Sequence, residues 1–233
     1  MIIGGFQKLS LVDYPNKVAV VVFMQGCSFR CPYCHNPELI PIKKRNKPRL
    51  SREAGEIFKY LEKKKYFLDG VCITGGEPTL HDSLPDFIKQ TKELGLLVKL
   101  DTNGSNPTMI KKLIKNKLVD YLAMDLKSSW ENYDKVININ DKKIVNDCKK
   151  TFKIIQASNI DHEFRTTVFP AIQTKKDFIK IASYLGPGEK YYLQNIKYKK
   201  NLDKKIDKKI TLNVSEIASS LQKAFPQVII KER

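Results

Sequence analysis

Six apolar stretches rich in β-branched residues recur along the chain, and amphipathic segments lie between them. A buried parallel strand appears in sequence as a short apolar run, and alternation of such runs with amphipathic segments is typical of βα units. The pattern therefore predicts a sixfold repeat of strand and helix. The predicted strands are Val18–Met24, Val71–Thr74, Leu96–Asp101, Val119–Asp125, Glu163–Phe169 and Lys190–Ile196, and the predicted helices are Ser51–Lys65, Ser83–Leu94, Pro107–Lys117, Lys142–Ser158 and Lys175–Tyr184.

The order of these elements sets the expected fold. Parallel strands joined by helices connect in a right-handed sense, so the sheet should curve into an open partial barrel with functional loops at the carboxyl ends of the strands. We therefore predict an α/β fold, a partial (βα)6 barrel, followed by a helix at Val214–Phe225 and a strand-like run at Val228–Ile230. We expect one domain over residues 1–233, with a core at about 17–200 and an extension at about 210–231, because a chain this long can bury one large core.

Composition and charge narrow the class of protein. No apolar run approaches the roughly 18 residues that a membrane span requires, and the N-terminus lacks the features of a secretion signal, so we expect a cytoplasmic protein. The formal charge of +17 favours acidic partners, whether a protein, a nucleic acid or an anionic cofactor. The stretch Lys197–Lys209 holds seven lysines, and we interpret it as a solvated surface loop or as a docking patch for a partner.

Three of the five cysteines crowd into the segment QGCSFRCPYCHN, directly after the first predicted strand. Cys27, Cys31 and Cys34 have the spacing CxxxCxxC, which suits a metal site in a reducing compartment better than a disulfide framework. Cys72 lies in an apolar strand and Cys148 on a helix, so we interpret both as core residues.

Three interpretations of the cysteine trio compete: an iron-sulfur cluster, a zinc site with His35 as fourth ligand, and buried structural cysteines. A zinc site would usually draw on a second, distant pair of ligands, and the chain offers no such pair of cysteines. A 4Fe-4S cluster held by three cysteines keeps one iron open to a ligand, as a catalytic zinc keeps an open position. The trio therefore favours a cluster at which chemistry occurs.

Further polar motifs follow later strands of the predicted barrel. Gly75 and Gly76 end the second strand in the run ITGGEPTL, DTNG follows the third, and DLK ends the fourth. Glycines at a strand end let a ligand approach the backbone closely. Arg165 lies in an apolar strand, where an unpaired charge is costly, so we expect an anionic partner: a bound carboxylate, or else Asp161 or Glu163.

The sequence resembles the radical S-adenosylmethionine (SAM) superfamily. The resemblance rests on the CxxxCxxC loop with an aromatic residue before its last cysteine, on the continuation CHNPEL, and on the motifs GGE, DTNG and DLK. The resemblance is strongest to the activating enzymes of glycyl-radical enzymes, such as those of anaerobic ribonucleotide reductase and pyruvate formate-lyase. It implies that a reduced 4Fe-4S cluster on Cys27, Cys31 and Cys34 cleaves SAM to a 5′-deoxyadenosyl radical, which takes a hydrogen atom from a glycine of a partner enzyme.

The resemblance also assigns residues to SAM. The glycines match the site of the methionine amino group, DTNG and Arg165 match contacts to ribose or carboxylate, and the residues flanking Cys34 match adenine contacts made partly through the backbone. In the pyruvate formate-lyase activating enzyme, the aspartates that match Asp101 and Asp125 help to hold a monovalent cation. Gln194 stands where that relative has a histidine. The SAM residues implied are Tyr33, Cys34, His35, Gly75, Gly76, Glu77, Asp101, Thr102, Asn103, Asp125, Leu126, Lys127, Arg165 and Gln194.

The implied partners are a glycyl-radical enzyme as protein substrate and a ferredoxin or flavodoxin as electron donor, whose acidity would suit a basic surface. Two alternatives remain at this stage. One is a radical SAM enzyme that modifies a small molecule or tRNA, which the charge would support although no RNA-binding motif is present. The other is a zinc or iron-sulfur binding module without catalysis.

Overall fold

The computed structural model describes residues 1–41, 50–198, 200–206 and 209–233. Eight strands form one sheet in the order β1-β2-β3-β4-β5-β6-β7-β8, and all neighbours are parallel except β1 and β2. The strands are β1 (Ile3–Ser10), β2 (Ala19–Met24), β3 (Gly70–Gly75), β4 (Leu97–Thr102), β5 (Tyr121–Asp125), β6 (Asp161–Val168), β7 (Lys190–Asn195) and β8 (Ile229–Glu232).

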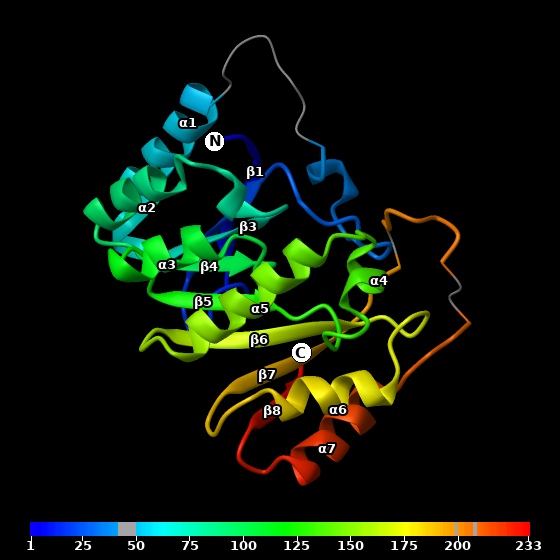
Figure 1. Ribbon diagram of the computed structural model, residues 1–233. Coiled ribbons are helices and arrows are strands. Elements are labelled where there is room, and N and C mark those ends of the chain that lie inside the picture. The colour runs from blue at the N-terminus through cyan, green and yellow to red at the C-terminus, as the bar shows by residue number, and fades with distance from the viewer. Residues whose placement is uncertain (42–49, 199, 207–208) are drawn as a thin grey trace.

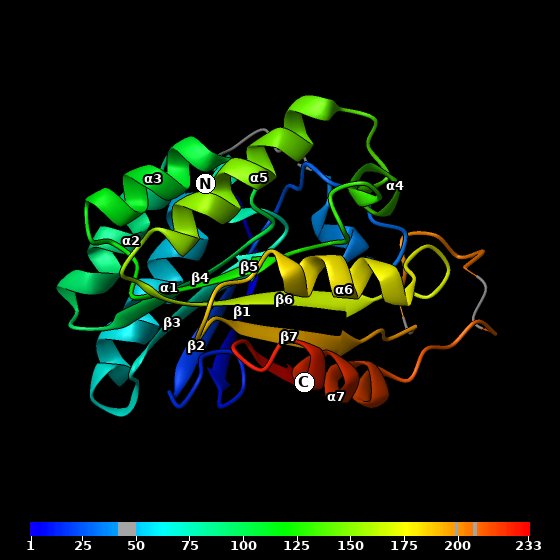
Figure 2. The ribbon, with the colours of Figure 1, turned by 60° about the horizontal axis from the view of Figure 1, so that its bottom comes forward.

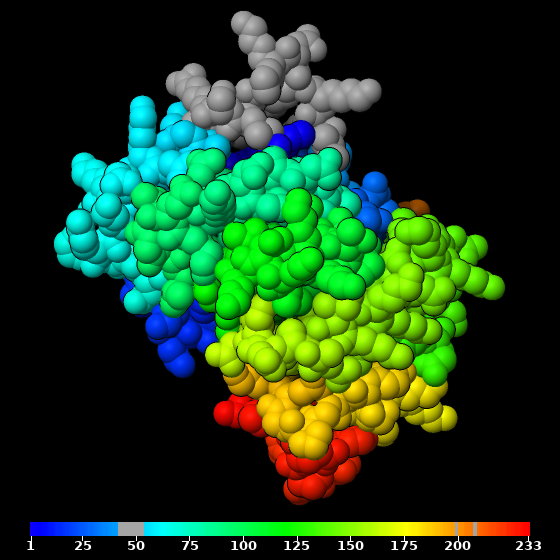
Figure 3. Space-filling model, turned by 60° about the vertical axis from the view of Figure 1, so that its left-hand side comes forward, coloured from blue at the N-terminus to red at the C-terminus, as the bar shows by residue number. Residues whose placement is uncertain are grey.

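Helices cover the outer face of the curved sheet (Figures 1 and 2). On the side seen in Figure 3, side chains of successive helices form a continuous surface over the strands. Each strand from β2 to β7 is followed by at least one helix, which confirms the predicted sixfold βα repeat and the α/β class. The helices are α1 (Leu50–Lys64), α2 (Leu84–Glu93), α3 (Pro107–Lys115), α4 (Tyr133–Ile137), α5 (Lys142–Gln156), α6 (Lys175–Ser183) and α7 (Val214–Ala224).

Among the strands and α-helices of the described residues, β1 and α4 lie outside the predicted set. Strand β1 contains Gly4 and Gly5 and is mostly exposed, so it carries no apolar run that would reveal it in the sequence. Helix α4 has only five residues, and its buried residues Tyr133, Val136 and Ile137 pack into the core near the carboxyl ends of the strands. The strand-like run near Val228 is β8, which pairs with β7 and extends the sheet.

The core lies between the sheet and the helices, whereas the inner face of the sheet carries charge. Alternation along β4 turns Val98 and Leu100 toward the helices and leaves Lys99 and Asp101 on the opposite face. Lys99 and Glu163 are both almost fully buried there. Because buried charges must be paired, this interior requires the ion pairs that surround the site described next. Within the described residues, none of the helices is both long and apolar enough to cross a bilayer.

Candidate active site

One cavity of about 350 Å³ opens at the carboxyl ends of β2 to β7, where a parallel α/β fold places its functional loops. The loop that follows β2, residues 25–36, is called the cysteine loop from here on. Its three thiols meet the ends of five other strands at this cavity. Of the residues assigned from the sequence, those that line it are Cys27, Cys31, Tyr33, Cys34, His35, Gly75, Gly76, Asp101, Thr102, Asn103, Asp125, Lys127, Arg165 and Gln194.

The cysteine loop is held by backbone hydrogen bonds. Gly26 N donates to Leu39 O at 2.6 Å, Cys27 N to Ile40 O at 3.2 Å, and Cys34 N to Cys31 O at 3.0 Å. All five cysteines of the chain are free. Burial raises the pKa of the Cys27 thiol to about 11 and that of the Cys31 thiol to about 12, and it also raises the pKa of Cys34. Without a metal these thiols hold their protons, which metal binding would release.

The donor set fits a 4Fe-4S cluster better than a single zinc ion. Among the described residues, no three Cys, His, Asp or Glu side chains converge as ligands of one ion would. A cluster makes a different demand, since each cysteine binds its own iron. His35 Nε2 already accepts a hydrogen bond from Lys197 N at 3.2 Å, which occupies the lone pair that a zinc ligand needs.

The hydroxyl of Tyr33 also indicates a bound group. It is the one buried side-chain polar atom without a hydrogen-bond partner in the part of the chain that the structure describes. Tyr33 is 4% exposed, packs with its ring against Phe169 and lines the cavity. An unpartnered buried hydroxyl is costly, so a group bound in the cavity would satisfy it.

Gly75 and Gly76 form the edge of the cavity between β2 and β3. Gly75 has φ +111°, a conformation that favours glycine, and Gly76 N donates to Met24 O at 2.8 Å. A Cβ built on Gly76 would lie 2.0 Å from the carbonyl oxygen of Gly26. The segments that follow β2 and β3 therefore approach each other too closely at Gly76 for any side chain.

We expect Gly76→Ala to destabilise the protein by about 1–3 kcal/mol, the usual cost of forcing extra volume into a packed site, and to displace the cysteine loop. Urea unfolding checks the first effect, and iron content after reconstitution checks the second. The matched control is Gly5→Ala, where a Cβ would meet no atom within 4 Å and where φ, as at Gly76, is not positive, so it adds the same methyl group without the clash. Equal losses in both variants would contradict the argument from close approach.

Glu77, which the resemblance assigns to SAM, does not line the cavity. Its carboxylate is fully buried and accepts from Thr79 N at 3.1 Å, Thr102 Oγ1 at 2.9 Å and Asn103 N at 2.6 Å. Burial raises its pKa in spite of these hydrogen bonds. Glu77 therefore links the loop after β3 to the end of β4 and the loop that follows it through hydrogen bonds.

Leu126, also assigned to SAM by the resemblance, likewise does not line the cavity. Its side chain is 1% exposed and belongs to the hydrophobic core, while its backbone N donates to Arg165 O at 2.8 Å. Its neighbours in the DLK motif, Asp125 and Lys127, face the cavity, because alternate residues of an extended segment point to opposite sides.

Asn103 has a more specific position than the sequence indicates. Its side-chain nitrogen lies 3.8 Å from Cys27 Sγ and 3.3 Å from Ser28 Oγ, so the DTNG motif contacts the cysteine loop directly. Ser28 Oγ in turn donates to Ser105 Oγ at 2.9 Å. The motif therefore supports the cysteine loop in addition to lining the cavity.

Arg165 joins the two aspartates of the cavity. Its Nε donates to Asp125 at 3.0 Å, and one terminal nitrogen donates to Asp101 at 3.1 Å, while Glu163 lies farther, at 3.9 Å. The strand register explains the contact with Asp125, because Arg165 of β6 lies directly opposite Asp125 of β5. The expected alternative, a pair with Asp161 or Glu163, is therefore not the main contact.

Two lysines complete this charged network. Lys99 pairs with Asp101, and Lys127 pairs with Asp125 at 2.8 Å. Burial alone would raise the pKa of each aspartate, but the nearby cations outweigh it and hold both pKa values below the ordinary range. The carboxylates assigned by resemblance to a monovalent cation thus already have cationic partners within the chain.

Several lining residues were not predicted, namely Asp13, Phe23, Phe29, Asn36, Ile40, Thr74 and Thr167. Phe23 and Thr74 lie near the carboxyl ends of β2 and β3, next to predicted motifs. Their positions at the strand ends could therefore have placed them at the cavity from the sequence. Asp13 lies in the connection between β1 and β2, and no feature of the sequence links it to the cavity.

The comparisons with known proteins agree with this geometry. The model of the radical SAM superfamily matches residues 21–185. A protein of Methanocaldococcus jannaschii named as a glycyl-radical enzyme activating enzyme is 32% identical over 99% of this chain and 95% of its own length. The pyruvate formate-lyase-activating enzyme of Streptococcus mutans is 29% identical over 79% of this chain and 72% of its own length.

Among solved structures, SuiB of Streptococcus suis bound to S-adenosylmethionine superimposes with a TM-score of 0.65 at 15% identity. The match covers 91% of this chain and 51% of SuiB, so the chain spans about half the length of that protein. At this identity the likeness concerns the fold alone. Since the family model matches most of the residues that build the cavity, the chain belongs to the radical SAM superfamily, whose cofactors are a 4Fe-4S cluster and SAM.

Proposed function

We propose that this protein cleaves SAM reductively and uses the resulting radical to generate a glycyl radical on a partner enzyme, such as anaerobic ribonucleotide reductase or pyruvate formate-lyase. The observation that carries the proposal is the cavity at which three cysteine thiols, the Gly75–Gly76 edge and the Arg165 network meet. The similarity to activating enzymes, over almost the full length in one case, supports this reaction over the alternatives.

When bound, the cluster supplies one electron to SAM, which breaks into methionine and a 5′-deoxyadenosyl radical. Cys27, Cys31 and Cys34 would hold the cluster through their thiolates, and a cluster with three cysteine ligands would keep one iron open to SAM. The backbone at Gly75 and Gly76 would contact the amino group of SAM. Lys127 and Arg165 attract the carboxylate by charge, while Asp101 and Asp125 fix the positions of these cations.

The far side of the cavity would receive the adenosine. Tyr33 and His35 flank Cys34, Thr102 and Asn103 lie at the end of β4, and Gln194 lies near the end of β7. The cavity is lined by buried residues, since Cys31 and Tyr33 are both less than 10% exposed. This burial would keep water away from the radical. Because both aspartates pair with cations of the chain itself, the proposal requires no added monovalent cation.

The remaining expectations complete the proposal. We infer that residues 1–233 act as one domain, because all eight strands belong to one sheet. The cytoplasm is the compartment in which free thiols persist, and a ferredoxin or flavodoxin there would supply the electron. The similarity to activating enzymes favours a protein as the substrate over a small molecule or a tRNA.

The test uses protein reconstituted with iron and sulfide without oxygen, reduced by photoreduced deazaflavin and supplied with SAM. We expect 5′-deoxyadenosine to form in the reduced sample and not in an unreduced control. Addition of a candidate glycyl-radical enzyme should then give a glycyl-radical signal by electron paramagnetic resonance. Absence of 5′-deoxyadenosine from protein with a full cluster would refute the cleavage reaction, and 5′-deoxyadenosine without a glycyl radical on any such enzyme would refute the substrate class.

A further inference from the structure

The described part of the lysine-rich stretch is not a detached surface loop. Residues 197–206, without residue 199, are called the basic strap here. The strap packs on the cysteine loop: Asp203 N donates to Pro32 O at 2.9 Å, Asn201 Nδ2 to Tyr33 O at 3.2 Å, and Lys197 N to His35 Nε2. Figures 1 and 2 show the strap in orange beside the blue cysteine loop in both views.

The strap presents cations at the outer surface of this contact. Lys197, Lys200, Lys204 and Lys205 are all exposed, and within the described residues no carboxylate lies within ion-pair distance of them. Asp203 uses its carboxylate to accept from the backbone N of Lys205 at 2.8 Å. Long lysine side chains without partners raise the positive potential around them.

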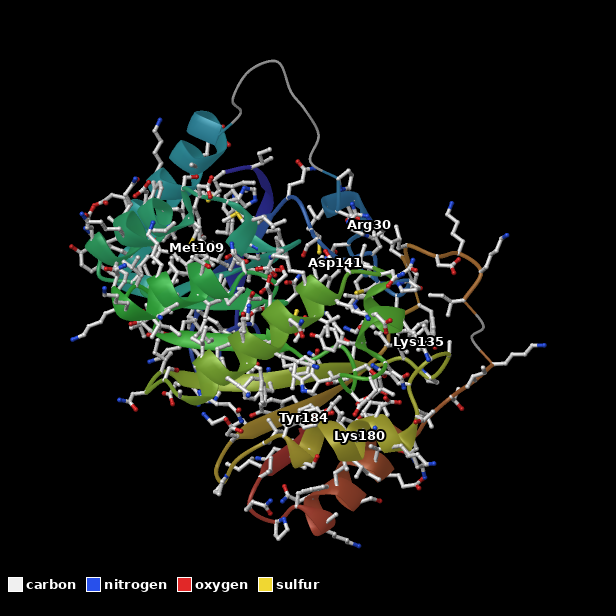
Figure 4. The ribbon with its side chains drawn as sticks, viewed as in Figure 1. Arg30, Met109, Lys135, Asp141, Lys180 and Tyr184 are labelled. Atoms are coloured by element: carbon white, nitrogen blue, oxygen red, sulfur yellow. The ribbon has the colours of Figure 1, made fainter. Side chains whose placement is uncertain are left out.

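Two further exposed cations, Arg30 and Lys135, lie on the cysteine loop and on α4. Arg30 is exposed, and its guanidinium donates to Cys27 O and Phe29 O, both at 2.8 Å, so its charge meets no carboxylate. Arg30 N donates to Ile137 O, which joins the cysteine loop to α4, the helix that carries the exposed Lys135. Figure 4 shows Arg30 and Lys135 at the end of the molecule where the strap lies.

Exposed carboxylates reduce this charge but do not cancel it. Glu38, Asp134 and Asp203 lie on the same segments as the cations. Among the described residues, six cations (Arg30, Lys135, Lys197, Lys200, Lys204 and Lys205) stand against these three exposed carboxylates. Asp141, labelled near Arg30 in Figure 4, is half-buried and accepts from the amide of Lys143. The surface around the cysteine loop is therefore positive, and this loop carries the thiols that would hold the cluster in the proposed function.

We propose that this surface is the docking site of an acidic one-electron donor protein, with the basic strap as its main electrostatic contact. Electron transfer slows steeply with distance, so a donor protein should bind close to the cluster. The cysteine loop carries the three thiols that would hold the cluster, and we therefore expect the donor to bind at this loop. In the step, a flavodoxin hydroquinone loses one electron to become the semiquinone, and the cluster gains that electron. The inference rests on the proposed function and adds the site of one partner.

The experiment compares the holoenzyme with the double variant Lys204→Glu/Lys205→Glu. The matched control is Lys59→Glu/Lys89→Glu, which makes the same charge change on α1 and α2, at the opposite side from the strap in Figure 1. The first measurement is the second-order rate constant for cluster reduction by reduced flavodoxin in stopped flow, at low and high salt. The second is the affinity of oxidised flavodoxin for each holoenzyme.

We expect the strap variant to lose roughly 10-fold or more in reduction rate at low salt, with weaker flavodoxin binding, because mutated rim charges mainly slow association. The difference should shrink at high salt, since screening weakens the attraction in the wild type. Reduction by photoreduced deazaflavin, a small donor without a docking site, should stay unchanged in both variants.

Three outcomes would overturn the inference. The strap variant could keep the wild-type rate with flavodoxin, or the control variant could lose as much. The strap variant could also be reduced normally yet form less glycyl radical or bind less tRNA, which would assign the surface to another macromolecule. Failure of the proposed function is separate, because it would show as missing 5′-deoxyadenosine even in wild-type protein reduced by deazaflavin.

Discussion

We expect Cys31→Ser to abolish formation of 5′-deoxyadenosine, with a loss of more than about 100-fold, since even an outer-shell partner of a metal site is worth about 10- to 100-fold. Cys31 is the most buried of the three thiols of the cysteine loop, at 7% exposed, and it faces the cavity. Its loss leaves two cysteine ligands for a cluster that needs three. Iron and sulfide content, and the electron paramagnetic resonance signal after reduction, should fall together with activity.

The matched control for this variant is Cys148→Ser. The Cys148 thiol is fully buried but donates to Asn103 O at 3.5 Å, a hydrogen bond that a serine hydroxyl can replace. We expect the control to keep its cluster and its activity. A cluster that survives in Cys31→Ser, or one that is lost from Cys148→Ser, would count against the assignment of the cysteine loop.

Arg165→Met is expected to destabilise the protein by about 3–5 kcal/mol, because removing one partner of a buried ion pair leaves the other charge uncompensated. Methionine keeps much of the length of the side chain but leaves Asp101 and Asp125 without their shared guanidinium. The variant should also bind SAM more weakly. Urea unfolding measures the first effect, and equilibrium binding of SAM to the reconstituted protein measures the second.

Arg165→Lys separates charge from geometry. A lysine keeps the positive charge, but its single ammonium cannot reproduce the planar fork that reaches both aspartates. We expect its stability to lie between those of the wild type and Arg165→Met. If Arg165→Met unfolds at the same urea concentration as the wild type, the network does not hold the site together.

The sequence predicts the strand ends well because each βα unit is marked by its own apolar run. The cysteines, the glycines and the DTNG and DLK motifs all follow such runs, so a parallel sheet brings them to one edge. Strand β1 escapes prediction because an exposed antiparallel edge strand needs no apolar run.

Side-chain direction and long-range contacts were harder to predict. Glu77 and Leu126 belong to motifs that line the cavity, but both point away from it, and adjacency in sequence does not reveal this. The partners of Arg165 depend on the register between β5 and β6, which no local pattern specifies. The contact between Asn201 and Tyr33 joins residues 168 positions apart.

The basic strap is attached mainly through main-chain groups. The amides of Asp203 and Lys197 and the side chain of Asn201 make its contacts with the cysteine loop, and none of the lysine ammonium groups takes part. The groups that attach the strap to the cysteine loop therefore differ from the ammonium groups that carry its charge. The lysines of the strap can consequently change without loosening the loop. In the docking proposed above, preference among electron donors could therefore be retuned, by evolution or by engineering, while the catalytic centre stays as it is.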